Sequence, residues 1–99
     1  MNINLKKNGA ALNVTVSGRL DTTTAPELEK ALSSQLEGIE SPTLDFGELA
    51  YISSAGLRVL LALQKTMNRQ GQMVVTHVND NTMEVFDVTG FVDVLTIRQ

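Results

Sequence analysis

The chain has 99 residues, of which 42% are hydrophobic, and a formal net charge of −3. This length suits one domain, residues 1–99, and is too short for two. The mild acidity and the lack of any Lys/Arg cluster argue against nucleic-acid binding. No apolar run approaches the roughly 20 residues of a membrane span, and none resembles a secretory signal. Without cysteine there is neither a disulfide framework nor thiolate chemistry. We therefore expect a cytoplasmic protein, with a monomer as the default state.

The first third of the chain predicts a β-hairpin and then a helix. Over residues 2–17, apolar side chains alternate with polar ones in two runs. Asn8-Gly9 separates the runs and is the pair best able to adopt positive φ at both centres of a tight turn. A helix over about residues 25–37 follows, because Thr24 and Glu27 fit a capping box and the apolar side chains beyond them recur at helical spacing.

The rest of the chain predicts helices alternating with short strands. The expected elements are a strand over residues 43–46, a helix over 54–68, a strand over 73–78, a third helix capped by Asn79 or Asn81 and ending near Thr89, and a final strand or tail over 92–97. Strands separated by helices require parallel crossovers. The predicted fold class is therefore α/β, with a mixed sheet of four or five strands that opens with an antiparallel hairpin and carries its helices mainly on one side.

Residues suited to catalysis are few. His77 is the only histidine, and its place near the end of a strand indicates a structural role. No spacing of acidic residues and histidine resembles a metal site. The seven glycines form neither GxGxxG nor GxxxxGK[ST]. We therefore expect no metal, no cofactor and no enzymatic activity.

The segment FGELAYISSAGLRVLL, residues 46–61, places Ser53 and Ser54 where a loop ends and an apolar helix begins. One interpretation is simple capping, because a serine oxygen accepts a hydrogen bond from a free helix N–H. The other is modification, because a helix N-terminus tolerates a phosphate. Such a phosphate would add about −1.5 to −2 charges at the surface. Ala55 and Gly56 are small, so we expect them to leave the hydroxyl uncovered and to let another protein approach closely.

Three segments together resemble a known family. DFGELAYISSAGLRVLLALQK, with GRLDTTTAPELEKAL before it and MVVTHVNDNTMEVFDVTGFVDVLTI after it, is similar to STAS domains, specifically to the bacterial anti-sigma factor antagonists. The resemblance runs from about Leu12 to Ile97. It implies a partner that is both an anti-sigma factor and a serine kinase. The unmodified antagonist would bind this partner and free the sigma factor, phosphorylation would abolish binding, and a separate phosphatase would reset the protein.

The resemblance also implies particular site residues. Aligned on Gly56-Leu57, the phosphoacceptor falls on Ser54 and the acidic position of GxLD falls on Asp21. Ser53 stands where the best-studied branch of the family has Asp, and it is the alternative acceptor. The expected partner-binding residues are Asp21, Thr22, Thr23, Ser53, Ser54, Ala55, Gly56, Leu57 and Arg58. Tyr51 and Leu57 could serve either packing or partner contact.

Two other functions remain open from the sequence. The first is a constitutive STAS subunit, for example one supporting an ATPase in a lipid-transport complex, which needs the fold but no phosphate. The second is a small nucleotide hydrolase, against which the missing phosphate-binding loop and general base weigh. An intact-mass measurement separates the first alternative from the phosphorylated antagonist, and a turnover assay tests the second.

Overall fold

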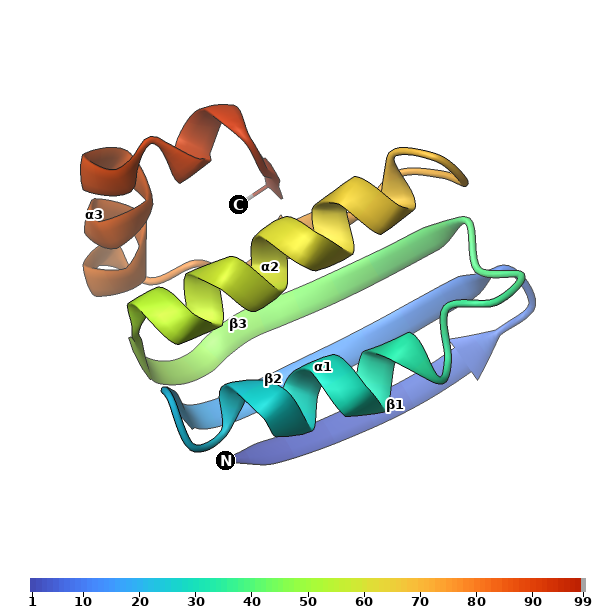
Figure 1. The fold of residues 1–99 in the computed structure, drawn as a ribbon, viewed down its shortest axis with the longest axis horizontal. Coiled ribbons are helices and arrows are strands. Elements are labelled where there is room, and N and C mark those ends of the chain that lie inside the picture. Colours follow the sequence, from blue (N-terminus) through green and yellow to red (C-terminus); the bar gives the residue numbers. More distant parts are fainter. Residues whose placement is uncertain (99) are drawn as a thin grey trace.

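A computed structural model describes residues 1–98 of the chain (Figure 1). Its elements are β1 (Asn2–Asn8), β2 (Ala11–Leu20), α1 (Ala25–Ser33), β3 (Ser41–Ile52), α2 (Ser54–Met67), β4 (Val74–Thr76), α3 (Asp80–Thr89), a 3₁₀ turn (Phe91–Asp93) and β5 (Thr96–Arg98). The five strands form one sheet in the order β1-β2-β3-β4-β5. β1 is antiparallel to β2 and the other neighbours are parallel, which confirms the predicted mixed sheet.

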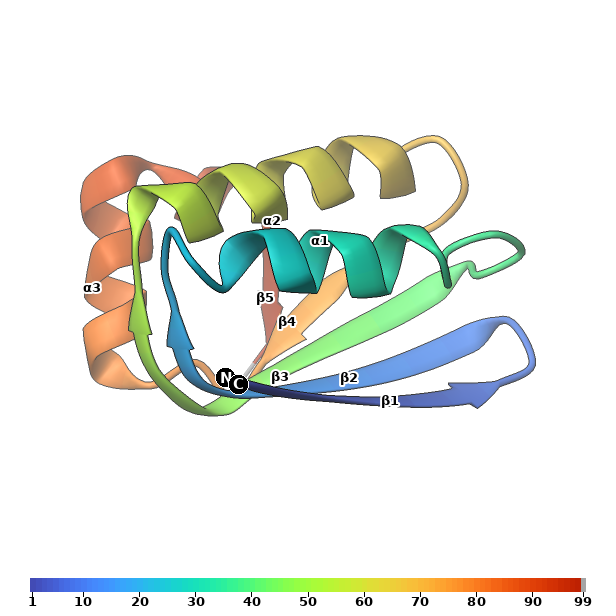
Figure 2. The same cartoon turned by 60° about the horizontal axis from the view of Figure 1, so that its bottom comes forward.

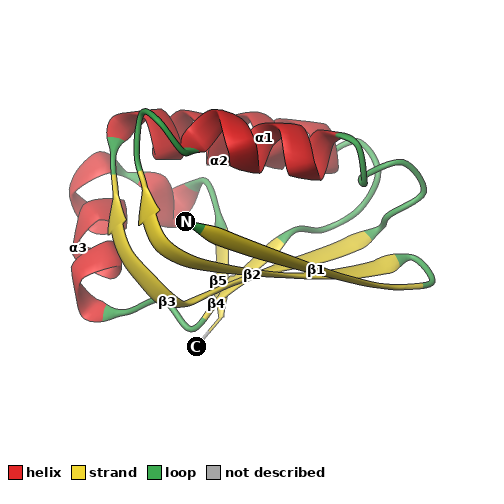
Figure 3. Cartoon of the chain, turned by 90° about the horizontal axis from the view of Figure 1, so that it is seen from below, coloured by secondary structure: helices red, strands yellow, loops and turns green. Residues whose placement is uncertain are grey.

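The helices are arranged in a layer on one side of the sheet. α1 and α2 lie side by side across one face, while α3 stands at the end of the sheet where β2 and β3 finish (Figure 2). Among residues 1–98 no helix covers the opposite face (Figure 3). Side chains from β2 and β3, such as Val14 and Leu44, pack with Leu28 of α1 and Leu60 of α2 to form the core, each at most 1% exposed. The prediction of helices mainly on one side is confirmed.

β3 is much longer than the strand predicted over residues 43–46, because it bends in its second half. Between Asp45 and Glu48, and again between Leu49 and Tyr51, β3 advances one residue more than its partner β2. Each extra residue is a bulge, and a bulge bends the strand and interrupts the alternation that marks strands in a sequence. The ends of β2 and β3 therefore curve up to the level at which α2 begins (Figure 3).

Several element ends differ from the predictions. The hairpin turn is Gly9-Ala10 rather than Asn8-Gly9, because Asn8 still pairs with Ala11 and only Gly9 has positive φ, at +62°. α1 ends at Ser33, four residues early, and β4 has three residues instead of six. The final segment is a 3₁₀ turn followed by β5. No helix within residues 1–98 has the length and apolar character needed to cross a membrane.

Candidate functional site

The two serines at the start of α2 have different environments. Ser53 is the N-cap, with extended backbone, and its Oγ accepts a long 3.5 Å hydrogen bond from the backbone N–H of Gly56. Ser54 is the first helical residue and is exposed. Within residues 1–98 its hydroxyl makes no side-chain hydrogen bond. Ser53 therefore caps the helix, whereas Ser54 exposes a hydroxyl that has no side-chain hydrogen bond within residues 1–98.

Gly56 and Leu57 face the interior, which corrects the expectation that Gly56 makes room for another protein. A methyl group on Gly56 would lie 2.8 Å from Leu20 Cγ and 2.9 Å from Ile52 Cγ1, so its small size admits the chain's own side chains. Leu57 is only 7% exposed. Gly56 packs α2 against the ends of β2 and β3, and Leu57 belongs to the buried core, so we remove both from the partner-binding face.

Asp21 organises the turn that leads into α1. Its Oδ1 accepts hydrogen bonds from the backbone N–H groups of Thr23, at 3.0 Å, and Thr24, at 3.1 Å. The bond from Thr24 above all, with that from Thr23 and the charge of Arg19, lowers the pKa of the Asp21 carboxyl against the opposing effect of burial. The carboxylate is thus ionised and partly exposed.

The predicted capping box does not form, because the Thr24 side chain has other partners. Its hydroxyl donates to the Arg19 carbonyl at 2.7 Å and accepts from the Asp21 N–H at 2.8 Å. Thr24 makes no side-chain cap bond to α1. Asp21 instead accepts the hydrogen bonds in the turn before this helix, so its side chain has a structural role.

Arg19, which the sequence analysis did not identify, forms a second part of the site together with Tyr51. They pair across β2 and β3, and the Arg19 guanidinium carbon lies 4.3 Å from the centre of the Tyr51 ring. Arg19 Nε also lies 3.6 Å from Asp21 Oδ2. Tyr51 is 43% exposed, so it is not a core residue. Only the bulged strand register brings these two side chains together, and single-sequence patterns do not reveal that register.

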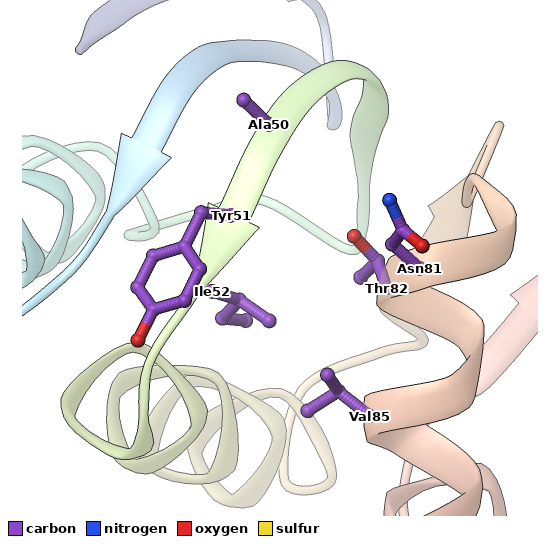
Figure 4. Close-up of a pocket in the computed structure, with 6 residues that line it drawn as sticks. All are labelled: Ala50, Tyr51, Ile52, Asn81, Thr82 and Val85. Atoms are coloured by element: carbon purple, nitrogen blue, oxygen red, sulfur yellow. The ribbon is translucent and has the colours of Figure 1, made fainter.

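A shallow groove of about 210 Å³ lies between the end of β3 and α3 (Figure 4). It is lined by Ala50, Tyr51, Ile52, Asn81, Thr82 and Val85. Asn79 fixes the far wall: its side-chain N–H donates to the Leu49 carbonyl at 2.7 Å, and its oxygen accepts from the Thr82 N–H at 2.8 Å. The groove is therefore anchored to β3 and adjoins the segment that carries Ser54.

The structure brings most of the remaining predicted partner-binding residues to one surface. The backbone N–H of Ser53 bonds to the Leu20 carbonyl at 2.9 Å, so the start of α2 adjoins the turn at Asp21. Thr22, Thr23 and Arg58 are exposed, and Ala55 is half-buried. We call the exposed residues Arg19, Thr22, Thr23, Tyr51, Ser54 and Arg58, together with the half-buried Asp21, the switch face.

His77 lies outside this set, at the end of β4. Its Nδ1 is 3.3 Å from Asp45 Oδ1 and 3.2 Å from Thr76 Oγ1, and its φ is +55°. In the part of the chain that the structure describes, no group of three or more His, Cys, Asp or Glu side chains could hold a metal ion.

Comparison with known proteins identifies the family of this chain. The family model for the STAS domain matches residues 2–99. BtrV of Bordetella bronchiseptica, named as a candidate anti-sigma factor antagonist, is 33% identical over 98% of this chain and 85% of its own. The anti-sigma-B factor antagonist of Listeria monocytogenes is 31% identical over 88% of this chain and 78% of its own.

Solved structures show the same fold. The anti-sigma factor antagonist SpoIIAA in its unphosphorylated form superposes with a TM-score of 0.78, at 13% identity, covering 99% of this chain and 88% of that one. The phosphorylated form of Bacillus SpoIIAA superposes with a TM-score of 0.77, at 14% identity, covering 99% and 92%. The chain belongs to the STAS domain family, among the anti-sigma factor antagonists.

Proposed function

We propose that the unmodified chain binds an anti-sigma factor that is also a serine kinase, and that phosphorylation of Ser54 ends this binding. Binding would free the sigma factor, in the cytoplasm, with this chain acting as a monomer. The observation that carries the proposal is the exposed, unbonded hydroxyl of Ser54 at the start of α2, within the switch face. Ser53 is the weaker candidate because its oxygen caps the helix.

The cycle needs two group transfers. The kinase transfers the terminal phosphoryl group of a nucleoside triphosphate to Ser54 Oγ, the hydroxyl proton is released, and the nucleoside diphosphate leaves. A separate phosphatase then adds water to the phosphoserine, which restores the hydroxyl and releases inorganic phosphate. Because Ser54 is exposed, neither transfer requires the chain to unfold.

The charge change is large enough to control docking. A phosphoserine adds about −1.5 to −2 charges. Placing this charge in a protein interface costs several kcal/mol in desolvation and like-charge repulsion. Moving a complex from 99:1 to 1:99 takes about 5.5 kcal/mol, so one phosphate has the right order of effect. The two solved forms of SpoIIAA support this reading, because the related fold accommodates a phosphorylated state.

A binding titration tests the proposal once affinity capture and mass spectrometry have identified the partner. We expect the unmodified chain and the Ser54→Ala variant to bind. Protein carrying phosphoserine at position 54 should bind at least about 100-fold more weakly, since about 3 kcal/mol corresponds to that factor. Ser53→Ala is the matched control, and the kinase should still add one phosphate to it. Equal affinity of the phosphorylated and unmodified chains would contradict the switch.

One observation favours a constitutive STAS subunit as the second candidate. Ser53, a neutral capping residue, stands directly before Ser54, so the preceding position offers no carboxylate to orient the acceptor hydroxyl. In that case the native chain carries no phosphate in any growth state. Capture experiments would then recover a transporter or ATPase subunit in place of a kinase.

A further inference from the structure

We propose that Arg58 receives the phosphate of phosphorylated Ser54, so that modification also withdraws this cation from the switch face. The inference rests on the proposed phosphorylation of Ser54 and deepens it. It assigns Arg58 a positioning role and gives the partner a chemistry, namely an acidic side chain opposite Arg58 in the unmodified complex.

The helix places the two residues together. Ser54 and Arg58 are four residues apart in α2, and both are exposed. Side chains at this spacing are neighbours on a helix, with Cβ atoms roughly 5–6 Å apart, and an anion four residues before a cation is the favourable order. An arginine can bond to two phosphate oxygens at once.

Arg58 is also available, whereas the other nearby arginine is engaged. Within residues 1–98, Arg58 makes no salt bridge and no side-chain hydrogen bond. Arg19 lies over the Tyr51 ring and 3.6 Å from Asp21 Oδ2, and it would have to give up both contacts to reach a phosphate. The groove wall from α3 contributes only Asn81, Thr82 and Val85, none of them charged. Of the two arginines discussed, Arg58 is therefore the one that can pair with the phosphate without giving up a contact that the described chain shows.

The pairing changes what a partner meets. Before modification, Arg58 is a free positive group on a chain whose net charge is −3, and it suits a carboxylate of the partner. After modification, the guanidinium is held by the chain's own phosphate. In the unmodified chain, a partner carboxylate would face the positive charge of Arg58. In the phosphorylated chain, the same carboxylate would face an arginine already paired with a phosphate, and the phosphate would carry additional negative charge.

The test uses the full chain with phosphoserine incorporated at position 54 and needs no partner. The ³¹P chemical shift followed against pH gives the second acid dissociation constant of the phosphate. We compare the otherwise unchanged phosphoprotein with its R58Q, R19Q and K65Q forms. Lys65 is the matched control, because it is an exposed cation on the same helix, about three turns away.

We expect the dissociation constant to fall about threefold in R58Q, since an exposed ion pair has an energy of this order, and to change little in R19Q and K65Q. An unchanged constant in R58Q overturns the inference, and so does an equal change in K65Q, which would show a net-charge effect. A change confined to R19Q, with altered fluorescence of Tyr51, the only tyrosine, assigns the phosphate to Arg19 and also overturns it. These outcomes are independent of partner affinity, so the pairing and the switch can fail separately.

Discussion

Replacing Gly56 with alanine tests whether α2 begins in direct contact with the ends of β2 and β3. The added methyl group would lie 2.8 Å from Leu20 Cγ, 2.9 Å from Ile52 Cγ1 and 3.1 Å from the Leu20 carbonyl oxygen. Leu20 is fully buried and Ile52 is 5% exposed, so neither side chain can swing into solvent. The first turn of α2 must therefore move outward.

Overpacking of this kind costs about 1–3 kcal/mol. Alanine recovers up to ~1 kcal/mol through its higher helix propensity, and less than that near a helix end. We therefore expect G56A to lower the free energy of unfolding by about 1–2 kcal/mol, which corresponds to a Tm lower by roughly 5–15 °C for a domain of this size. Urea and thermal unfolding followed by circular dichroism measure both quantities.

Ser54→Ala is the control for this substitution, because it changes an exposed residue in the same turn without a steric conflict. Its effect should stay within about 0.5 kcal/mol. If G56A were as stable as the wild type, the close contact between α2 and the strand ends would be wrong. In that case there would also be no reason to exclude Gly56 from the partner-binding face.

Three further substitutions test other parts of the structure. Asn79→Ala removes both the cap of α3 and the bond to the buried Leu49 carbonyl. It should lower the free energy of unfolding in urea by about 2–3 kcal/mol, whereas the control Asn81→Ala should lower it by at most about 0.5 kcal/mol. The lowered pKa of Asp21 stabilises the fold above the ordinary range for aspartate, and this contribution disappears as pH falls through the lowered value. Asp21→Asn should therefore be less stable than wild type at neutral pH, with a difference that narrows in acid; a constant difference in the urea midpoint would refute the electrostatic origin. Gln64 is 7% exposed and its Oε1 has no partner within residues 1–98, so Gln64→Met should leave the Tm unchanged or raise it, and a clear loss would indicate a partner for that oxygen.

Local chemistry made much of the fold predictable. The start of α2 follows from Ser53 and the apolar run after it, and the end of α3 from Gly90, which adopts positive φ. The start of α1 was predicted correctly, but for the wrong reason. Thr24 fits the capping pattern, yet its hydroxyl is bound to Arg19 and Asp21. A threonine hydroxyl can bond either to the helix N–H groups or to nearby backbone groups of the preceding turn. A sequence pattern does not show which of these bonds forms.

Long-range pairing accounts for what could not be predicted. Two bulges carry β3 six residues past its expected end, and they determine which side chains of β2 and β3 meet. The contact between Arg19 and Tyr51 follows from that register, as does the approach of β3 to α3 that forms the groove. The exposed place of Ser54 at the start of α2 follows from the local helix-start pattern, and its proposed role, like that of Asp21, comes from the family resemblance. The contact that Arg19 makes with Tyr51 across β2 and β3 could not be inferred in this way.

The start of α2 places buried and exposed residues within a few positions of one another. Ile52, Gly56 and Leu57 are buried, and Gly56 lies directly against Ile52 at the end of β3. Ser54 and Arg58, between and after them, point outward and make no side-chain hydrogen bond within the described chain. We therefore expect that a charge added to Ser54 would change no packed contact, so that the fold stays intact while the surface becomes more negative. The proposed switch would act through the altered surface alone, and it requires that the inward-facing residues stay tightly packed. The stability of G56A tests that packing, and the ³¹P titration of the phosphate on Ser54 tests the surface pairing with Arg58.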